Sequence, residues 1–441
     1  MTQKFFPVLL TLALLAGPGV AAPAGGSASA PVAKNEAAPL AEARAAYNRR
    51  DYAQAREIWQ PLAEAGNAEA QFNLGYLYRK GWGVKPDDVQ ARRWYEQAAA
   101  AGHAEAQQNL GFLYDQGLGG PRDDAKARQL YEQAAAAGNV LAQQNLGVFY
   151  KDGRGGKRDY GQAKAWFEKA AAAGNASAQV NLGALYEQGL GVKADLNKAR
   201  ELYEQAAAAG SADAQANLGL LHSRGAGVKP DYELARQWLE KAAGAGQANA
   251  QLHLGHLYAR GLGVKADPAK ARQLYEQAAA AGDAEAQYTL GTLYETGADG
   301  KADPAQARHW YEKAATAGNG AAQNKLGVIY AQGRGVKQDY GQARRWYEQA
   351  AAAGNGNAPY NLGLLYAKGQ GVKQDYARAR EWFQRGAEAG DADAQYNLGA
   401  LYALGQGGPQ NLTEARRWFL KAAAQGDENA KQALQKLKGR R

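Results

Sequence analysis

The sequence contains no cysteine and a single methionine among its 441 residues. Without thiols the chain can form no disulfide bond, so an exported form would have to be stable through packing alone. A lipoprotein anchor is excluded as well, because that anchor is attached to a cysteine. Beyond the N-terminus no segment offers the roughly 20 consecutive apolar residues that span a bilayer. We therefore expect neither disulfides nor a membrane span.

Recognisable catalytic motifs are absent too. The sequence has no Ser-His-Asp spacing, no nucleophile elbow and no clustered pair of carboxylates, so no residue can be assigned to catalysis. Its Gly-x-Gly pairs, such as Gly81 with Gly83, resemble phosphate loops in spacing. A phosphate loop follows a strand and begins a helix, whereas these pairs lie between two helical segments. We expect no enzymatic activity and no cofactor.

Residues 1–22 have the features of a secretory signal peptide. Lys4 supplies a positive charge, residues 5–16 form an apolar run, and Pro18 breaks the helix before small residues suited to cleavage. The alternative is a membrane anchor, but a run of 12 residues is shorter than the about 20 that an anchor needs. We expect an exported protein, in the periplasm in the first place or else secreted.

The segment after the leader, residues 23–37, consists mainly of Ala, Pro, Gly and Ser with few charges. Such a composition cannot bury a core and predicts a flexible linker. The formal net charge of the chain is +9, which favours nucleic acid only where the charge gathers on one surface. Export argues against a nucleic-acid partner.

A nine-residue pattern organises the rest of the chain. It reads AQFNLGYLY over residues 70–78 and returns every 36 residues without a slip in spacing. Ten copies begin at Ala70, Ala106, Ala142, Ala178, Ala214, Ala250, Ala286, Ala322, Ala358 and Ala394, and a degenerate copy begins at Ala430. A constant period of this length is typical of a solenoid, in which each repeat contacts only its neighbours.

We expect each repeat to be a helical hairpin. The first helix has apolar residues at three- and four-residue spacing, and a glycine pair ends it because glycine accepts a left-handed backbone conformation. Asp87 and its equivalents, always Asp or Asn, are the predicted N-caps of the second helix, each contributing about 1 kcal/mol. The second helix is expected to bury Trp94 and Tyr95 between alanines.

Gly75 and its equivalents recur inside the first helix of all ten repeats. Glycine there costs up to about 1 kcal/mol relative to alanine, so its recurrence needs a structural reason. We expect a close approach of the two helices of each repeat, with the rings of Trp94 and Tyr95 filling the adjoining space.

The spacing also predicts how the chain is capped. Residues 38–66 carry a shortened copy of the pattern and are expected to form an N-terminal capping hairpin. The ten repeats occupy residues 67–426. Residues 427–441 are expected to form a C-terminal capping helix with a basic tail, which keeps the end of a solenoid polar.

The repeat reads A-x-A-Q-x-N-L-G-x-L-Y-x-x-G-x-G-V-x-x-D, then A-R-x-W-Y-x-x-A-A-x-x-G, and closely resembles the Sel-1-like repeat, a relative of the tetratricopeptide repeat. The first repeat matches that motif at Ala68, Ala70, Gln71, Leu74, Gly75, Tyr78, Gly81, Gly83, Ala91, Trp94, Tyr95, Ala98 and Gly102. The resemblance covers about residues 40–438.

This resemblance implies an all-α fold, a right-handed α–α superhelical solenoid. It also implies an adaptor or scaffold, often in bacterial envelope, signalling or host-contact settings. One branch of exported bacterial relatives is cysteine-rich and disulfide-stapled, with a penicillin-binding activity claimed for some members. The present chain has no cysteine and departs from that branch, so we do not expect that activity.

Comparison of the ten copies separates recurring positions from variable ones. The residues equivalent to 72, 76 and 79 vary, and they lie at i, i+4 and i+7 beside the recurring apolar stripe. Stacked, they are expected to line a concave groove for a peptide or protein. The alternative is that they only pad the next helix. The candidate groove residues are Phe72, Tyr76, Phe112, Leu252, His256, Tyr288, Tyr360, Leu364 and Tyr396. Among them Tyr288, Tyr360 and Tyr396 are the expected anchors.

Lysine follows the glycine turn in eight of the ten repeats. These lysines are Lys85, Lys157, Lys193, Lys229, Lys265, Lys301, Lys337 and Lys373. They predict a basic edge that could meet an anionic glycan, lipid headgroups or an acidic protein. The alternative is a solvated loop charge offset by the Asp two residues later.

The five histidines are candidate metal ligands: His103, His222, His253, His256 and His309. A metal site needs three or four converging ligands. His222 replaces a recurring Tyr and His253 a recurring Asn, so substitution within the repeats explains both. We expect no metal.

Together these patterns predict a non-catalytic scaffold of the bacterial cell envelope that binds a protein or peptide in its groove. The second interpretation is an envelope protein that binds polysaccharide or peptidoglycan through the basic edge and the groove tyrosines.

Overall fold

The structure is a computed structural model that describes residues 36–225, 229–298, 300 and 302–438. The predicted signal peptide, nearly all of the predicted linker and the last three residues of the basic tail lie outside these ranges. The described residues form 23 α-helices and no strand, which confirms the all-α fold class. None of the described helices is long and apolar enough to cross a membrane.

The first two helices form a hairpin ahead of the repeats. They are α1 (Ala37–Asn48) and α2 (Tyr52–Glu64). The Asp51 side chain caps α2 by accepting a hydrogen bond from the backbone N–H of Gln54. Pro61 lies inside α2, and the helix continues through it to Glu64.

Each repeat consists of two antiparallel helices. The first helices are α3 (Ala68–Lys80), α5 (Ala104–Gln116), α7 (Val140–Asp152), α9 (Ala176–Gln188), α11 (Ala212–Arg224), α13 (Ala248–Arg260), α15 (Ala284–Thr296), α17 (Gly320–Gln332), α19 (Ala358–Lys368) and α21 (Ala392–Leu404). The second helices are α4 (Asp88–Ala100), α6 (Asp124–Ala136), α8 (Tyr160–Ala172), α10 (Leu196–Ala208), α12 (Tyr232–Gly244), α14 (Pro268–Ala280), α16 (Pro304–Thr316), α18 (Tyr340–Ala352), α20 (Tyr376–Glu388) and α22 (Leu412–Ala424). A last helix, α23 (Glu428–Lys438), follows the repeats.

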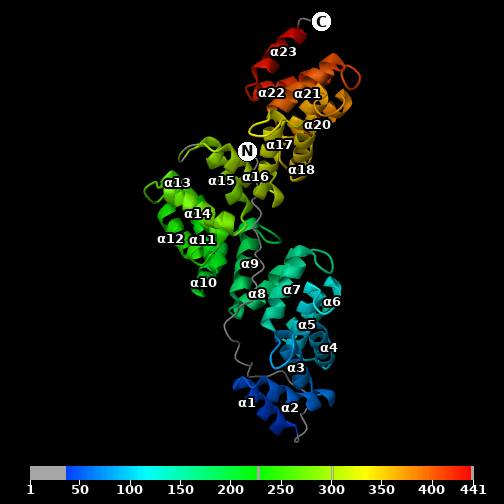
Figure 1. The fold of residues 1–441 in the computed structure, drawn as a ribbon, viewed down its shortest axis with the longest axis vertical. Helices are drawn as coiled ribbons and strands as arrows, with labels where there is room; N and C mark the ends of the chain where they lie inside the picture. The colour runs from blue at the N-terminus through cyan, green and yellow to red at the C-terminus, as the bar shows by residue number, and fades with distance from the viewer. Residues whose placement is uncertain (1–35, 226–228, 299, 301, 439–441) are drawn as a thin grey trace. The chain divides into compact units, whose positions relative to one another are not determined.

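The chain divides into two compact parts, with the boundary between Asp195 and Leu196. The first part contains α1 to α9 and the second α10 to α23 (Figure 1). Within each part every helix packs on the next along the chain. Within one part, a first helix thus contacts the second helix of its own repeat and that of the repeat before it, as a solenoid requires; α9 and α10 belong to different parts.

The turns within the repeats follow the predicted chemistry. Gly81 ends α3 with φ of 69° and Gly83 follows at 66°, both in the left-handed region that glycine tolerates best. The Asp87 side chain then accepts hydrogen bonds from the N–H groups of Val89 and Gln90 at the start of α4. The left-handed glycines and the Asp cap recur along both compact parts.

The glycine inside the first helix has the predicted role. A Cβ atom built on Gly75 would lie 2.7 Å from two carbons of the Tyr95 ring, so only glycine lets this ring approach. Tyr95 is fully buried. The prediction for Trp94 was wrong in degree, because its ring is only half-buried. Residues 94 and 95 point about 100° apart on a helix, and only Tyr95 faces Gly75.

A row of buried glutamines joins successive repeats. Gln71 donates through Nε2 to the carbonyl of Ala63, at 3.0 Å, and Gln107 does the same to Ala99, at 3.2 Å. Further copies of this bond are made by Gln143, Gln179, Gln251, Gln287, Gln323 and Gln395. Each bond runs from a first helix to the end of the preceding second helix, where it adds a second donor to a carbonyl that also accepts the N–H of the following glycine, as Ala63 does from Gly66.

Candidate binding surface

Positions are named here by their numbers in the first repeat, residues 67–102. The first-helix face is the surface formed by positions 72, 73, 76 and 79 of the first helices. The structure places eight of the nine candidate groove residues half-buried on this face, whereas Leu252 is only 3% exposed. The first compact part carries Phe72, Tyr76 and Phe112, and the second part carries the other six.

The aromatic side chains at position 72 rest on the second helix of their own repeat. The ring of Phe72 lies 5.9 Å from that of Tyr95, and the ring of Tyr288 lies 5.7 Å from that of Tyr311. The same pairing joins Tyr360 to Phe383 at 6.0 Å and Tyr396 to Phe419 at 5.7 Å. One side of each ring therefore packs on the core while the other stays exposed. Packing against a neighbouring helix therefore accounts for part of each of these side chains.

Neighbouring repeats also touch along this face. The guanidinium of Arg79 lies 4.5 Å above the ring of Phe112, and the ring of Phe72 stacks on His103 at 4.7 Å. Tyr76 makes an edge contact of 5.7 Å with Trp82 in the turn. The first two repeats thus present a nearly continuous strip of aromatic and cationic groups.

Position 73 was not among the predicted site residues, yet it lies on the same face. Lys151, at position 79, donates to Oδ1 of Asn181, at position 73 of the next repeat, over 3.1 Å. Asn361 donates to Asn324, at position 72 of the preceding repeat, over 3.0 Å. Position 73 therefore fills the gap between the variable stripes of adjacent repeats.

Asparagine occupies position 73 in seven repeats: Asn73, Asn109, Asn145, Asn181, Asn217, Asn361 and Asn397. Unlike the buried glutamines at position 71, they share no hydrogen-bond partner. Within the described ranges the side chains of Asn73, Asn109 and Asn217 make no hydrogen bond, whereas that of Asn397 donates to its own helix at Asp393. The repeated NLG triplet was the sequence signal that could have revealed this row.

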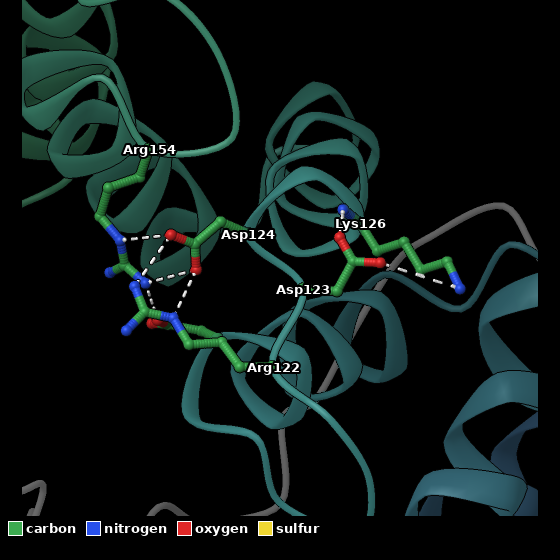
Figure 2. Close-up of polar contacts among 6 residues, drawn as sticks. Arg122, Asp123, Asp124, Lys126 and Arg154 are labelled. Carbon is green, nitrogen blue, oxygen red and sulfur yellow. Dashed lines mark hydrogen bonds and ion pairs between the residues drawn. The ribbon is translucent and has the colours of Figure 1, made fainter.

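The charges at position 79 are largely used between repeats. Arg154, in the turn after α7, hydrogen-bonds Asp115 at position 79 of the preceding repeat and also Asp124, at 2.9 Å (Figure 2). Arg122 donates two hydrogen bonds of 2.8 Å to the same carboxylate of Asp124. Hydrogen bonds from Arg122 and Arg154 lower the pKa of Asp124 well below its usual value. These carboxylates are therefore engaged within the chain.

The second part repeats this arrangement at Glu295, also at position 79. Its carboxylate accepts from Lys325 at 2.7 Å and from the Tyr311 hydroxyl at 2.8 Å, and Arg334 lies 3.7 Å away. Burial opposes ionisation of Glu295, but the hydrogen bonds from Lys325 and Tyr311 prevail and lower its pKa. Arg154 and Arg334 occupy the same turn position, so the two clusters are equivalent.

The seven described lysines of the predicted basic edge are all exposed: Lys85, Lys157, Lys193, Lys229, Lys265, Lys337 and Lys373. Lys301 lies outside the described residues. Among the described residues these seven form no ion pair. The Asp two residues later is occupied as a helix cap, as Asp87, Asp159 and Asp339 illustrate.

Two half-buried histidines lie side by side on α13. The rings of His253 and His256 lie 6.0 Å apart, and His256 Nδ1 is 2.9 Å from the Tyr275 hydroxyl. Burial lowers the pKa of both imidazoles to about 4. No group of three or more His, Cys, Asp or Glu side chains is arranged for a metal anywhere in the described ranges.

Comparison with known proteins gives a consistent result. The model of the Sel1 repeat matches ten consecutive segments, at 68–103, 104–139, 140–175, 176–211, 212–247, 248–283, 284–319, 320–355, 357–391 and 392–427. The curated proteins that were compared contain no match.

Two solved structures are similar over most of the chain. A protective antigen of uropathogenic Escherichia coli strains with an SLR fold shares 34% identity over 92% of this chain and 88% of its own, with a TM-score of 0.60. A Sel1 repeat protein from Oxalobacter formigenes shares 34% identity over 70% of this chain and 90% of its own, with a TM-score of 0.53.

Proposed function

The chain belongs to the Sel1 repeat family, whose members are generally protein–protein interaction scaffolds, and we propose that it is a non-catalytic scaffold of the bacterial cell envelope. Its partner is a protein or peptide held on the first-helix face. The proposed location, periplasmic or secreted, rests on the leader-like residues 1–22.

The observation that carries this proposal is the contrast between positions 71 and 73. The glutamines at position 71 recur because each donates to a carbonyl of the preceding repeat. The asparagines at position 73 recur without a common partner, although positions 72 and 76 beside them have diverged. A carboxamide offers two donors and an acceptor, which suits the backbone of a bound polypeptide. The half-exposed rings at position 72 supply apolar contacts next to it.

The Tyr95 hydroxyl gives further support. It is buried without a hydrogen-bond partner in the described part of the chain. In the equivalent positions the Tyr275 hydroxyl contacts His256 and the Tyr311 hydroxyl contacts Thr292, both at position 76. The first repeats therefore keep unused polar groups at the base of the first-helix face.

The test is crosslinking in cells of the tagged full chain, followed by quantification of each crosslinked protein. Replacing Tyr288, Tyr360 and Tyr396 with alanine should remove specific crosslinks, while the fold remains because Ala216 occupies the same position in another repeat. The matched control removes exposed apolar groups elsewhere, at Leu404 and Leu420, which are 67% and 53% exposed. Equal losses from the two variants, or no loss from either, would refute binding on this face.

A second candidate function, binding of an envelope polysaccharide or peptidoglycan, is favoured by the exposed and unpaired lysines of the basic edge. Seven like charges along the turns attract an anionic polymer and make its binding dependent on salt. If binding of such a polymer were insensitive to salt, the basic edge would have no part in it.

A further inference from the structure

The turn between α17 and α18 contains a pocket that the first-helix face does not include. Its volume is about 610 Å³, and its lining includes Tyr330, Lys337, Gln338, Tyr340 and Gly371. Ligand pockets commonly have volumes of about 300 to 1,000 Å³, so this one has room for one or two sugar rings. Gly371 comes from the turn of the next repeat, so two turns form the pocket.

The sequence of these turns distinguishes them from the other eight. Both read Lys-Gln-Asp-Tyr, at residues 337–340 and 373–376, whereas the remaining repeats carry other combinations, such as KADP at 265–268. The backbone of Gly371 approaches Tyr340 so closely that a Cβ atom there would lie 2.6 Å from the Tyr340 Cβ, and its φ is +67°. Glycine at this point fixes Tyr340 against the second turn.

The hydrogen bonds around Tyr340 leave one group unused. Gln338 donates through Nε2 to the carbonyl of Ala331 at 2.7 Å and to the Tyr340 hydroxyl at 3.0 Å, which uses both of its N–H groups. Gln370 donates to the same hydroxyl at 3.0 Å. The oxygen of Tyr340 thus accepts two bonds, and a phenol has one proton to donate. No described residue accepts that proton.

The free groups of the pocket are both donors and acceptors. The donors are the Tyr340 O–H, the second N–H of Gln370 and the ammonium of Lys337, which forms no ion pair with any described residue. The acceptors are the amide oxygens of Gln338 and of Gln370, which precedes the lining residue Gly371, and the carboxylate of Asp339, which also lines the pocket and accepts from the N–H of Gln342 as the cap of α18. A sugar ring carries several adjacent hydroxyls that each donate and accept, whereas in an acidic peptide the side-chain carboxylates only accept and the donors are the backbone N–H groups, one per residue. The positive charge of Lys337 selects a sugar that carries an acid.

From this geometry we propose that the paired Lys-Gln-Asp-Tyr turns form a binding site for an acidic oligosaccharide. Lys337 binds the sugar carboxylate, and the hydroxyl of Tyr340 and the amide of Gln370 bind its ring hydroxyls. The site is separate from the first-helix face and gives the polysaccharide function a defined location, so it can exist whether or not that face binds a protein.

The test measures binding of three probes to the full chain without its leader by isothermal titration calorimetry. The probes are a hyaluronan hexasaccharide, in which glucuronate alternates with N-acetylglucosamine, the neutral chitin hexasaccharide and a glutamate hexamer. We expect saturable binding of the hyaluronan probe and binding at least tenfold weaker for the other two. Equal affinity for the glutamate hexamer would refute recognition of hydroxyls, and absence of saturable hyaluronan binding would refute the site.

Matched variants locate the binding. Tyr340→Phe keeps the ring and removes only the hydroxyl, and Lys337→Gln removes the charge, so each should weaken hyaluronan binding about tenfold, the effect of about 1.4 kcal/mol for a hydrogen bond to a charged or polar ligand group. Lys265→Gln removes the same charge from a KADP turn and should change affinity less than twofold. Equal effects of the two lysine variants would refute a discrete site in favour of a diffuse basic edge. Crosslinking through the first-helix face should be unchanged in Tyr340→Phe, so failure of either proposal is seen independently of the other.

Discussion

His253 and His256 should make the second compact part sensitive to acid. Both imidazoles lie beside each other on α13, near Arg224 and Arg260. Burial lowers the pKa of each from 6.5 to about 4. The unfolded chain takes up protons on them below about pH 6.5, whereas the folded chain does not until about pH 4. Protonation therefore favours the unfolded state, and stability is lost as the pH falls through this window.

The size of the effect follows from the pKa difference. Each pKa unit corresponds to about 1.36 kcal/mol, so at pH 5, about 1.5 units below the ordinary value, each histidine costs about 2 kcal/mol and the pair about 4 kcal/mol. Above about pH 7 both states are neutral and the cost vanishes. The Tyr275 hydroxyl lies 2.9 Å from His256 Nδ1, and it carries no negative charge to offset the protonation.

Hydrogen exchange of the α13 amides in the full chain measures this directly. We expect the opening free energy of these amides to fall by about 4 kcal/mol between pH 7.5 and pH 5, after correction for intrinsic exchange. The double variant His253→Asn with His256→Leu should remove most of this fall, since Asn and Leu occupy these positions in other repeats. His309→Asn is the control, because His309 is exposed. If the double variant lost stability in parallel with the wild type, the burial argument would be wrong.

Three further predictions concern the contacts between helices and between repeats. Gly75→Ala places a methyl group against the Tyr95 ring and should destabilise the chain by about 1 to 3 kcal/mol in thermal melting. Gly244→Ala places its methyl group in open space and should stabilise the chain by up to about 1 kcal/mol in the same assay. Gln107→Leu removes the side-chain hydrogen bond to Ala99, whose carbonyl keeps the N–H of Gly102 as a donor, and should cost about 0.5 to 1.5 kcal/mol in urea unfolding. Arg154→Leu leaves two carboxylates facing each other and should cost about 1 kcal/mol at low salt, and the loss should shrink in 1 M salt if charge is its cause.

The fold could be predicted from the sequence because its determinants are local and repeated. The 36-residue period, the glycine pair at each turn and the Asp or Asn cap each depend on backbone chemistry within a few residues. The role of Gly75 was predictable for the same reason, since a costly residue retained in every repeat implies a close approach. The half-burial of Trp94 was not, because the rotation of the second helix decides which of two adjacent rings faces the core.

The candidate site was less accessible to sequence reasoning. Position 79 varies between copies, which suggested a partner, but Asp115 and Glu295 turned out to pair with Arg154 and Arg334 of the following repeats. Such pairs join residues 39 positions apart, and the two arginines occur only where an acid precedes them at that distance. This covariation between repeats was present in the sequence, but its meaning depends on knowing which turn packs on which helix.

In a chain of near-identical repeats, comparison of equivalent positions can separate structural from functional reasons for retaining a residue. A recurring residue can be retained because neighbouring repeats need it, as the position-71 glutamines are. Position 73 behaves differently: of the three substitutes for asparagine, His253 is used internally by burial and Lys325 by its ion pair with Glu295, and the third is Thr289. Where asparagine remains, Asn73, Asn109 and Asn217 make no hydrogen bond within the described residues. Duplication of the repeats alone does not explain the retained asparagines, because positions 72 and 76 have diverged in the same repeats. The contrast therefore supports the proposal that a partner binds on the first-helix face.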